Sequence, residues 1–156
     1  MIDPAQKDKK LQKPLYLYYQ NKMSLEYSPK NNPRVIVIQK LYGMYFNNEK
    51  ALTFPKHRFK KFIKDVVRGT IERNDVINDE IKNHLTSDVN LKNLDKVFQV
   101  IIKSAIFEFL YKPKTSDKII IKEYLNASNY FLEESQTKYL NALLDKISKK
   151  IRNSNG

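Results

Sequence analysis

The chain has 156 residues, a formal net charge of +12 and no cysteine. Its length fits a single domain with one core, and the lack of cysteine excludes disulfides, thiolate metal ligands and cysteine nucleophiles. The positive charge favours a polyanionic partner such as nucleic acid. Lysines outnumber arginines 24 to five, however, and an AT-rich genome would produce the same excess.

The sequence offers little for catalysis, cofactor binding or membrane insertion. With three glycines in the chain, a P-loop or a dinucleotide-binding fingerprint is impossible. His57 and His84 have no Cys or His at ligand spacing, so we expect structural histidines and no metal site. No apolar run approaches the about 18 residues of a membrane span, and the N-terminus lacks a secretory signal pattern. We expect a cytoplasmic protein that is not an enzyme, has no cofactor and does not bind membranes.

In chain order, residues 1–32 form a lysine-rich extension, and residues 33–153 form the predicted helical domain. Residues 14–20 of the extension read PLYLYYQ, which is too aromatic for a solvated tail. We expect this segment to dock on the helical domain. A platform on which RNA bases stack is the alternative.

The first helix of the domain is predicted to begin at Asn32 and Pro33, because Asn caps the free amides and proline suits the first turn. Residues 34–46 place five apolar side chains near one face, namely Val35, Ile38, Leu41, Tyr42 and Tyr45. A second amphipathic pattern covers residues 59–71 and continues over 76–85. Gly69 inside it costs about 1 kcal/mol relative to Ala, so we expect another helix to approach closely there.

Three more amphipathic helices are predicted between residues 94 and 152. Asp95 is a candidate N-cap of the first, and Pro113 ends it because proline cannot continue a helix. Ser116 and Asp117 can cap the second helix. Apolar residues recur at spacings of three and four in all of them, which predicts that each helix buries one face. No segment alternates with a period of two, so the sequence predicts no sheet.

The residue types in these helices resemble the C-terminal half of the NusB family of bacterial antitermination factors. The matching positions are Glu108, Tyr111, Lys118, Ile121, Glu123, Phe131, Lys138, Tyr139, Asn141, Leu144, Asp145 and Lys146. The helix over 34–46 adds the family pattern R-x-x-x-x-Q-x-L-Y at Arg34, Gln39, Leu41 and Tyr42. Lys30 keeps a positive charge upstream, whereas Asn31 and Asn32 stand where the family has more basic residues.

The resemblance implies an all-α, NusB-like bundle of about six or seven helices. It implies binding to boxA-type single-stranded RNA of ribosomal RNA operons as a heterodimer with NusE, a small-subunit ribosomal protein. This pair would join the RNA polymerase elongation complex and suppress termination. The residues implied for RNA binding are Lys30, Arg34, Gln39, Tyr42, Lys118, Phe131, Lys138 and Tyr139. Glu108 and Tyr111 are implied to contact the protein partner.

Two other functions stay open. One is a stand-alone NusB-like RNA-binding module, related to the domain that precedes ribosomal-RNA cytosine methyltransferases. The other is a purely structural basic protein whose charge follows genome composition. Without the resemblance, Tyr42 and Tyr139 would be interpreted as core aromatics and Glu108 as a solvated residue.

The resemblance also leads to a prediction for the extension. Relatives carry an additional helix where this chain has the short loop 47–55. Large apolar side chains gain roughly 1.5–3 kcal/mol each from full burial. We therefore expect residues 15–19 to pack on the bundle where that helix would be.

Overall fold

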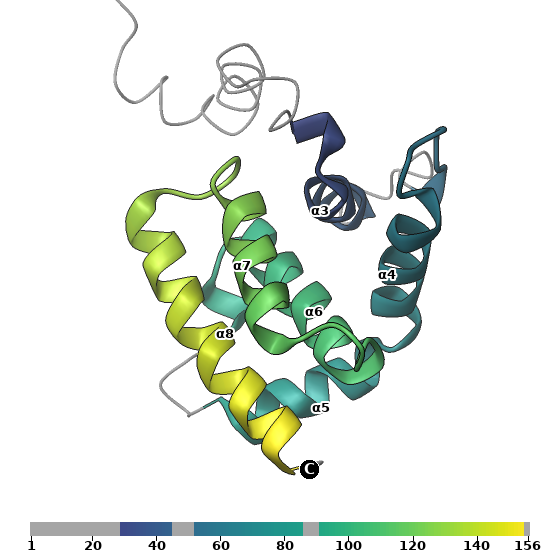
Figure 1. The fold of residues 1–156 in the computed structure, drawn as a ribbon. Helices are drawn as coiled ribbons and strands as arrows, with labels where there is room; N and C mark the ends of the chain where they lie inside the picture. The colour runs from purple at the N-terminus through teal and green to yellow at the C-terminus, as the bar shows by residue number, and fades with distance from the viewer. Residues whose placement is uncertain (1–28, 45–51, 86–90, 155–156) are drawn as a thin grey trace, which may run out of the picture.

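The computed structural model describes residues 29–44, 52–85 and 91–154 of the chain (Figure 1). These ranges contain six α-helices and no strand: α3 (Pro33–Met44), α4 (Lys60–Glu72), α5 (Asn74–His84), α6 (Lys96–Tyr111), α7 (Asp117–Ser128) and α8 (Glu134–Ser154). Short 3-10 turns, η2 (Pro29–Asn31) and η4 (Leu91–Asn93), precede α3 and α6. The predicted all-α bundle is confirmed. Within the described part of the chain, no helix combines the length and apolarity that a membrane crossing needs.

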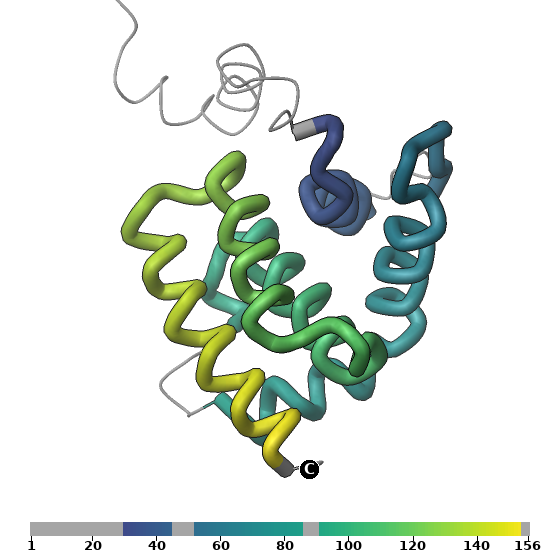
Figure 2. Tube along the Cα trace, viewed as in Figure 1, coloured from purple at the N-terminus to yellow at the C-terminus, as the bar shows by residue number. Residues whose placement is uncertain are grey.

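Helix α6 is the centre of the bundle, and the other five helices all pack against it. Twelve of its 16 residues are buried, which leaves it almost no solvated face. A helix that is apolar nearly all round is stable only when neighbours cover it on several sides. In the view of Figure 2, α4 and α8 therefore lie on opposite sides of α6.

The predicted helix ends are largely confirmed. The Asn32 side-chain oxygen accepts hydrogen bonds from the backbone N–H groups of Arg34 at 3.0 Å and Val35 at 3.3 Å. The Ser116 hydroxyl accepts from the Ile119 N–H at 3.2 Å, and α6 ends two residues before Pro113. Asp95 occupies the N-cap position of α6, but its carboxylate accepts from Gln136 of α8 at 3.3 Å and from no amide of α6.

Most residues of the predicted apolar stripes are buried, but Phe59, Ile71 and Val76 of the pattern over 59–85 are 40%, 39% and 39% exposed. On α8 the buried residues of the stripe are Leu140, Leu143, Leu144, Ile147 and Ile151. The pattern over 59–85 is interrupted at Arg73, which separates α4 from α5. Tyr45, residues 15–19 and most of the loop 47–55 lie outside the described residues, so the docking of the aromatic segment stays a prediction.

At Gly69, α4 lies directly against the Phe107 side chain of α6. A Cβ atom built at this position would collide with the ring of Phe107, whose Cε1 atom would be 3.0 Å away and whose Cε2 and Cζ atoms would be nearer still. Any side chain there would force the two helices apart or displace the ring. The predicted close approach of a second helix at Gly69 is thus confirmed.

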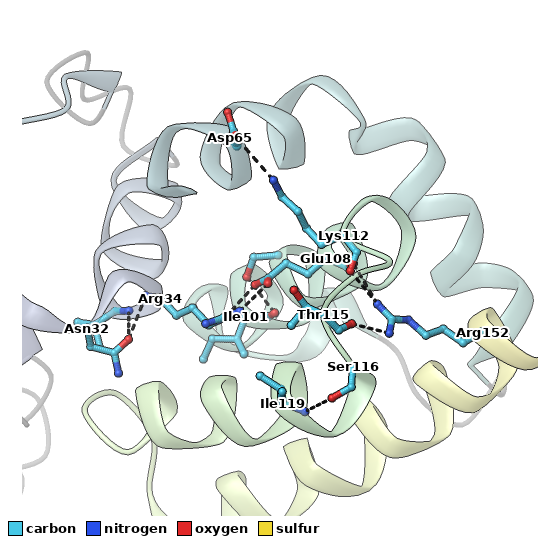
Figure 3. A network of polar contacts seen from close by, with 12 residues as sticks. Asn32, Arg34, Asp65, Ile101, Glu108, Lys112, Thr115, Ser116, Ile119 and Arg152 are labelled. Atoms are coloured by element: carbon cyan, nitrogen blue, oxygen red, sulfur yellow. Dashed lines mark hydrogen bonds and ion pairs between the residues drawn. The ribbon is translucent and has the colours of Figure 1, made fainter. Parts of the chain in front are cut away.

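Hydrogen bonds from Arg152 join the C-terminal end of α8 to the turn between α6 and α7. The Arg152 guanidinium donates to the backbone carbonyl oxygens of Phe109, Thr115 and Lys112 at 3.3, 2.7 and 3.2 Å, and to that of Glu108 at 3.5 Å (Figure 3). The carbonyls of Glu108 and Lys112 also accept the backbone N–H groups of Lys112 and Thr115, at 2.9 and 3.0 Å, so Arg152 adds a second donor to each of them. No motif in the sequence predicts this role for Arg152.

Candidate nucleic-acid interface

Arg34 and Glu108, which the resemblance placed at two different binding surfaces, face each other inside the protein. The Arg34 Nε atom donates to Glu108 Oε2 at 3.0 Å, and its Nη2 atom donates to Oε1 at 2.6 Å (Figure 3). Arg34 is 9% exposed and Glu108 is fully buried. This is the two-pronged geometry in which a guanidinium matches a carboxylate best.

Aromatic rings surround the pair. The Arg34 guanidinium carbon lies 4.8 Å from the ring centroid of Phe62 and 5.4 Å from that of Tyr124. Burial, the largest influence, lowers the pKa of Arg34, but the hydrogen bond to Glu108 and the nearby charges outweigh it and the net shift is upward. Burial and then the Glu108 carboxylate raise the pKa of the Tyr124 hydroxyl well above its ordinary value. The site holds one buried cation and one buried anion.

The surface roles expected for Arg34 and Glu108 therefore need correction. A side chain that is enclosed by the core and bonded to its counter-ion cannot also contact an RNA phosphate or a protein partner. Removing one member of such a pair leaves a buried charge without a partner, which costs about 3–5 kcal/mol. The two residues join α3 to α6 and stabilise the fold.

Tyr139 and Lys138, from the second turn of α8, do lie on the surface. The Tyr139 ring is 40% exposed and stacks on Phe98 of α6, with ring centroids 5.7 Å apart and planes 28° from parallel. The Lys138 side chain is 78% exposed, and its amine lies 3.7 Å from the Glu134 carboxylate. An exposed aromatic ring for base stacking and an exposed amine for phosphate contact are the groups that proteins use to bind single-stranded nucleic acid.

The other residues predicted to bind RNA are spread over the bundle. Lys118 lies in the first turn of α7 and Phe131 follows its last turn, so about 15 Å of helix separates them, at 1.5 Å per residue. Lys118 is exposed, whereas Phe131 is half-buried and packs against the core. Lys30 and Gln39 are exposed on η2 and α3, and Tyr42 is half-buried.

The beginnings of α8 and of α3 contact opposite ends of α6. Gln136 bonds to Asp95, which brings the beginning of α8 to the beginning of α6. Arg34 bonds to Glu108, which brings the beginning of α3 to the last turns of α6. The residues on η2 and in the first turns of α3 and those on α8 thus approach α6 from different ends, and no single face is established for the predicted set.

Tyr111 is the second residue that the resemblance assigned to the partner protein, and it is on the surface. Its ring is 37% exposed and packs against Phe107 at 5.1 Å between centroids. The Arg73 guanidinium lies 5.2 Å from the ring centroid. Tyr111 therefore remains available for contact with another molecule, unlike Glu108.

Both histidines make structural contacts, as predicted. His57 Nε2 lies 2.9 Å from the Lys30 carbonyl oxygen, and its Nδ1 atom accepts from the Phe59 N–H at 2.9 Å. His84 Nε2 lies 2.6 Å from a carboxylate oxygen of Glu80, one turn earlier on α5. In the ranges that the structure describes, His, Asp and Glu side chains form no group of three or more that could hold a metal ion.

The bundle defines an all-helical protein with the NusB fold. A solved structure of T. maritima NusB matches it with a TM-score of 0.66 at 22% sequence identity, over 78% of this chain and 91% of that one. The sequence model of the NusB family matches residues 31–149. The chain belongs to the NusB family.

Relatives that are named as transcription antitermination proteins also place the chain in the NusB family. The transcription antitermination protein NusB of Rickettsia bellii (strain OSU 85-389) is 29% identical over 122 residues, which cover 76% of this chain and 78% of the relative. The protein of the same name from Rickettsia massiliae (strain Mtu5) is 28% identical over 121 residues, 72% of this chain and 75% of the relative.

Proposed function

We propose that the chain is a transcription antitermination factor that acts by binding single-stranded RNA. The RNA is of the boxA type found in ribosomal RNA operons, and the chain binds it together with NusE. The pair joins the RNA polymerase elongation complex and suppresses termination. Membership of the NusB family and the name of the curated relatives support this proposal over a methyltransferase-type module.

The observation that carries the RNA part of the proposal is the stacked pair of Tyr139 and Phe98. Phe98 is buried and holds one side of the Tyr139 ring, while 40% of Tyr139 stays open to solvent. A ring that is already held in place loses little conformational freedom when a base stacks on it. Lys138, the preceding residue of α8, supplies an exposed cation. Every base has a flat face, so the platform gives affinity, and its neighbours give the choice of sequence.

The protein partner has one remaining candidate residue on this chain. Of the two residues implied for NusE, Tyr111 is exposed and Glu108 is enclosed. We keep Tyr111 as the candidate contact. The mechanism is binding alone, with no covalent bond made or broken. The chain and NusE each contribute part of one RNA-binding surface.

Binding of a boxA RNA in the presence and absence of NusE tests the proposal. Tyr139→Ala should weaken RNA binding by about 1–3 kcal/mol, because it removes one stacking platform. Tyr111→Ala should lower the affinity of the chain for NusE. Calorimetry with each partner measures both effects. Equal RNA affinity of Tyr139→Ala and the unaltered protein would contradict the assignment of the platform.

A further inference from the structure

The three exposed arginines of this chain all lie between residues 58 and 73. Arg34 is in the buried ion pair, and Arg152 fastens α8 to backbone carbonyls. The other three of the five arginines are Arg58, Arg68 and Arg73, and all three are exposed. Lysine is the usual cation in this chain, with 24 lysines to five arginines, yet the three exposed arginines gather in this stretch.

Two of these arginines, Arg68 and Arg73, line a groove of about 800 Å³ between α4 and the last turns of α6. Six cationic residues line it, namely Lys60, Lys61, Lys64, Arg68, Arg73 and Lys112, against two carboxylates, Asp65 and Glu72. Lys112 and Asp65 form an ion pair at 3.5 Å across the groove, which leaves five cations against Glu72. Lys60, Lys64 and Arg68 follow each other at intervals of four residues, so α4 presents them along one face.

The arginines rest on aromatic rings. The guanidinium carbon of Arg73 lies 5.2 Å from the ring centroid of Tyr111 in the groove, and that of Arg68 lies 5.5 Å from the centroid of Phe54. Arg58 lies 5.2 Å from Phe59, whose ring is 40% exposed. A guanidinium laid on a ring keeps its N–H groups at its edge, where they can bond two phosphate oxygens at once.

The groove is built into the packing of the bundle. Gly69 and Phe107 both line it, and the absence of a side chain at Gly69 is what lets the two helices approach. Its position differs from that of the Tyr139 platform. Phe98 lies in the first turn of α6, whereas Phe107 and Tyr111 lie in its last turns, roughly 13–20 Å further along the helix at 1.5 Å per residue.

We propose that this α4–α6 groove is a second nucleic-acid site, which holds the phosphate backbone of single-stranded RNA without reading its sequence. A hollow lined by cations, with aromatic rings at their sides, matches the combination that non-specific single-strand binding uses. A lipid surface is flat and fits a convex basic face better than a hollow. The groove is separate from the platform on α8, so the two sites can fail independently.

The double variant Arg68→Gln/Arg73→Gln tests the site, with a 20-nucleotide oligouridine as the probe. Each single-strand phosphate contact contributes about 0.7 to the slope of log K against log salt, so the slope should fall by about 1.4. Affinity at 0.1 M salt should then drop by roughly ten- to thirtyfold. Fluorescence anisotropy at four salt concentrations measures both values, and melting temperatures show whether each variant is folded.

The matched control is Lys82→Gln/Lys122→Gln, which removes the same net charge from exposed positions on α5 and α7, outside both sites. An equal loss in the control would mean that net charge alone attracts the RNA, and an unchanged slope in Arg68→Gln/Arg73→Gln would mean that the groove is not used. Arg68→Lys/Arg73→Lys should recover the slope. Either contrary result would overturn the proposal.

Two further outcomes separate this site from the proposed function. If Arg68→Gln/Arg73→Gln keeps oligouridine affinity but loses NusE, the groove is a protein-binding surface and the proposal is wrong. If Tyr139→Ala loses boxA binding while the groove variant binds all RNA normally, the proposed function stands and the second site does not. The expected result is that the groove variant weakens oligouridine and boxA RNA by similar factors.

Discussion

Two charged regions of this protein match the same family pattern and have opposite physical roles. Arg34 and Glu108 form an ion pair with exposures of 9% and 0%. Lys138 and Glu134 form another in which the side chains are 78% and 87% exposed. In the first pair, each charge depends on the other, because neither is solvated. In the second, water supports both charges, so the amine is available to another molecule.

The sequence contained a signal for this difference, and it is one of position. Arg34 precedes Ile38 by four residues and Leu41 by seven, so it lies on the apolar stripe of its helix. Glu108 follows Ile101 by seven residues and Ala105 by three, on the corresponding stripe of α6. A charge on a buried stripe needs an opposite charge nearby. Two such charges of opposite sign, on two helices of one bundle, predict each other.

The largest expected effect comes from reversing one buried charge. Glu108→Lys would put two cations in contact in the core, where breaking a pair already costs about 3–5 kcal/mol. This is a large part of the about 5–15 kcal/mol that keeps a domain folded. We expect a protein that unfolds in little or no urea, followed by circular dichroism. Glu133→Lys, at an exposed position before α8, is the control. Equal urea midpoints for Glu108→Lys and Glu133→Lys would indicate that Glu108 lies on the surface and can contact a partner.

Removing both charges should cost much less than removing one. Replacing a buried ion pair by apolar residues of similar volume is often neutral or stabilising by about 1–4 kcal/mol. Arg34→Met/Glu108→Leu should therefore be more stable than Glu108→Leu alone, although both lack the carboxylate. Urea unfolding of the two single variants and the double variant gives the coupling free energy. Additive losses would show that the pair does not interact as the structure indicates.

The local features of the fold were predicted from the sequence, and the long-range contacts of Arg152, Arg34 and Glu108 were not. The caps at Asn32 and Ser116, the buried stripes and the close approach at Gly69 all follow from a few neighbouring residues. Arg152 was missed because its acceptors are backbone carbonyls, 37 to 44 residues earlier in the chain, which carry no side-chain signal. Arg34 and Glu108 are 74 residues apart, and the resemblance gave each a separate role. The pattern identified positions that matter without distinguishing folding from binding.

A smaller effect should appear in the pH dependence of stability. The Tyr124 hydroxyl is buried, and among the described residues no partner meets hydrogen-bond geometry. Its pKa is raised by burial and then by Glu108. The unfolded chain releases this proton near pH 10 and the folded chain only at higher pH. The stabilisation is therefore complete below about pH 10 and is lost as the pH rises beyond it.

Tyr124→Phe removes the titrating group and leaves the ring beside Arg34. The variant should be about as stable as the unaltered protein at pH 7 and should lose less stability between pH 9.5 and 11. Urea midpoints over that range measure the difference. Lysines titrate in the same range in both proteins, so the comparison between them isolates Tyr124. Parallel curves would show that its pKa is not raised.

The smallest effect on stability is expected when an exposed ion pair of α8 is removed. Lys138 and Lys149 both form ion pairs with a carboxylate one turn earlier on α8, at 3.7 Å to Glu134 and 3.0 Å to Asp145. Exposed pairs of this kind contribute about 0.3–0.5 kcal/mol, so Lys138→Ala and Lys149→Ala should melt at nearly the same temperature. Binding to boxA RNA should differ, because Lys138 directly precedes Tyr139 on α8 and Lys149 lies three turns away. A salt slope reduced by about 0.7 in Lys138→Ala alone would assign it a phosphate. Equal slopes in the two variants would show that Lys138 is an ordinary solvated lysine.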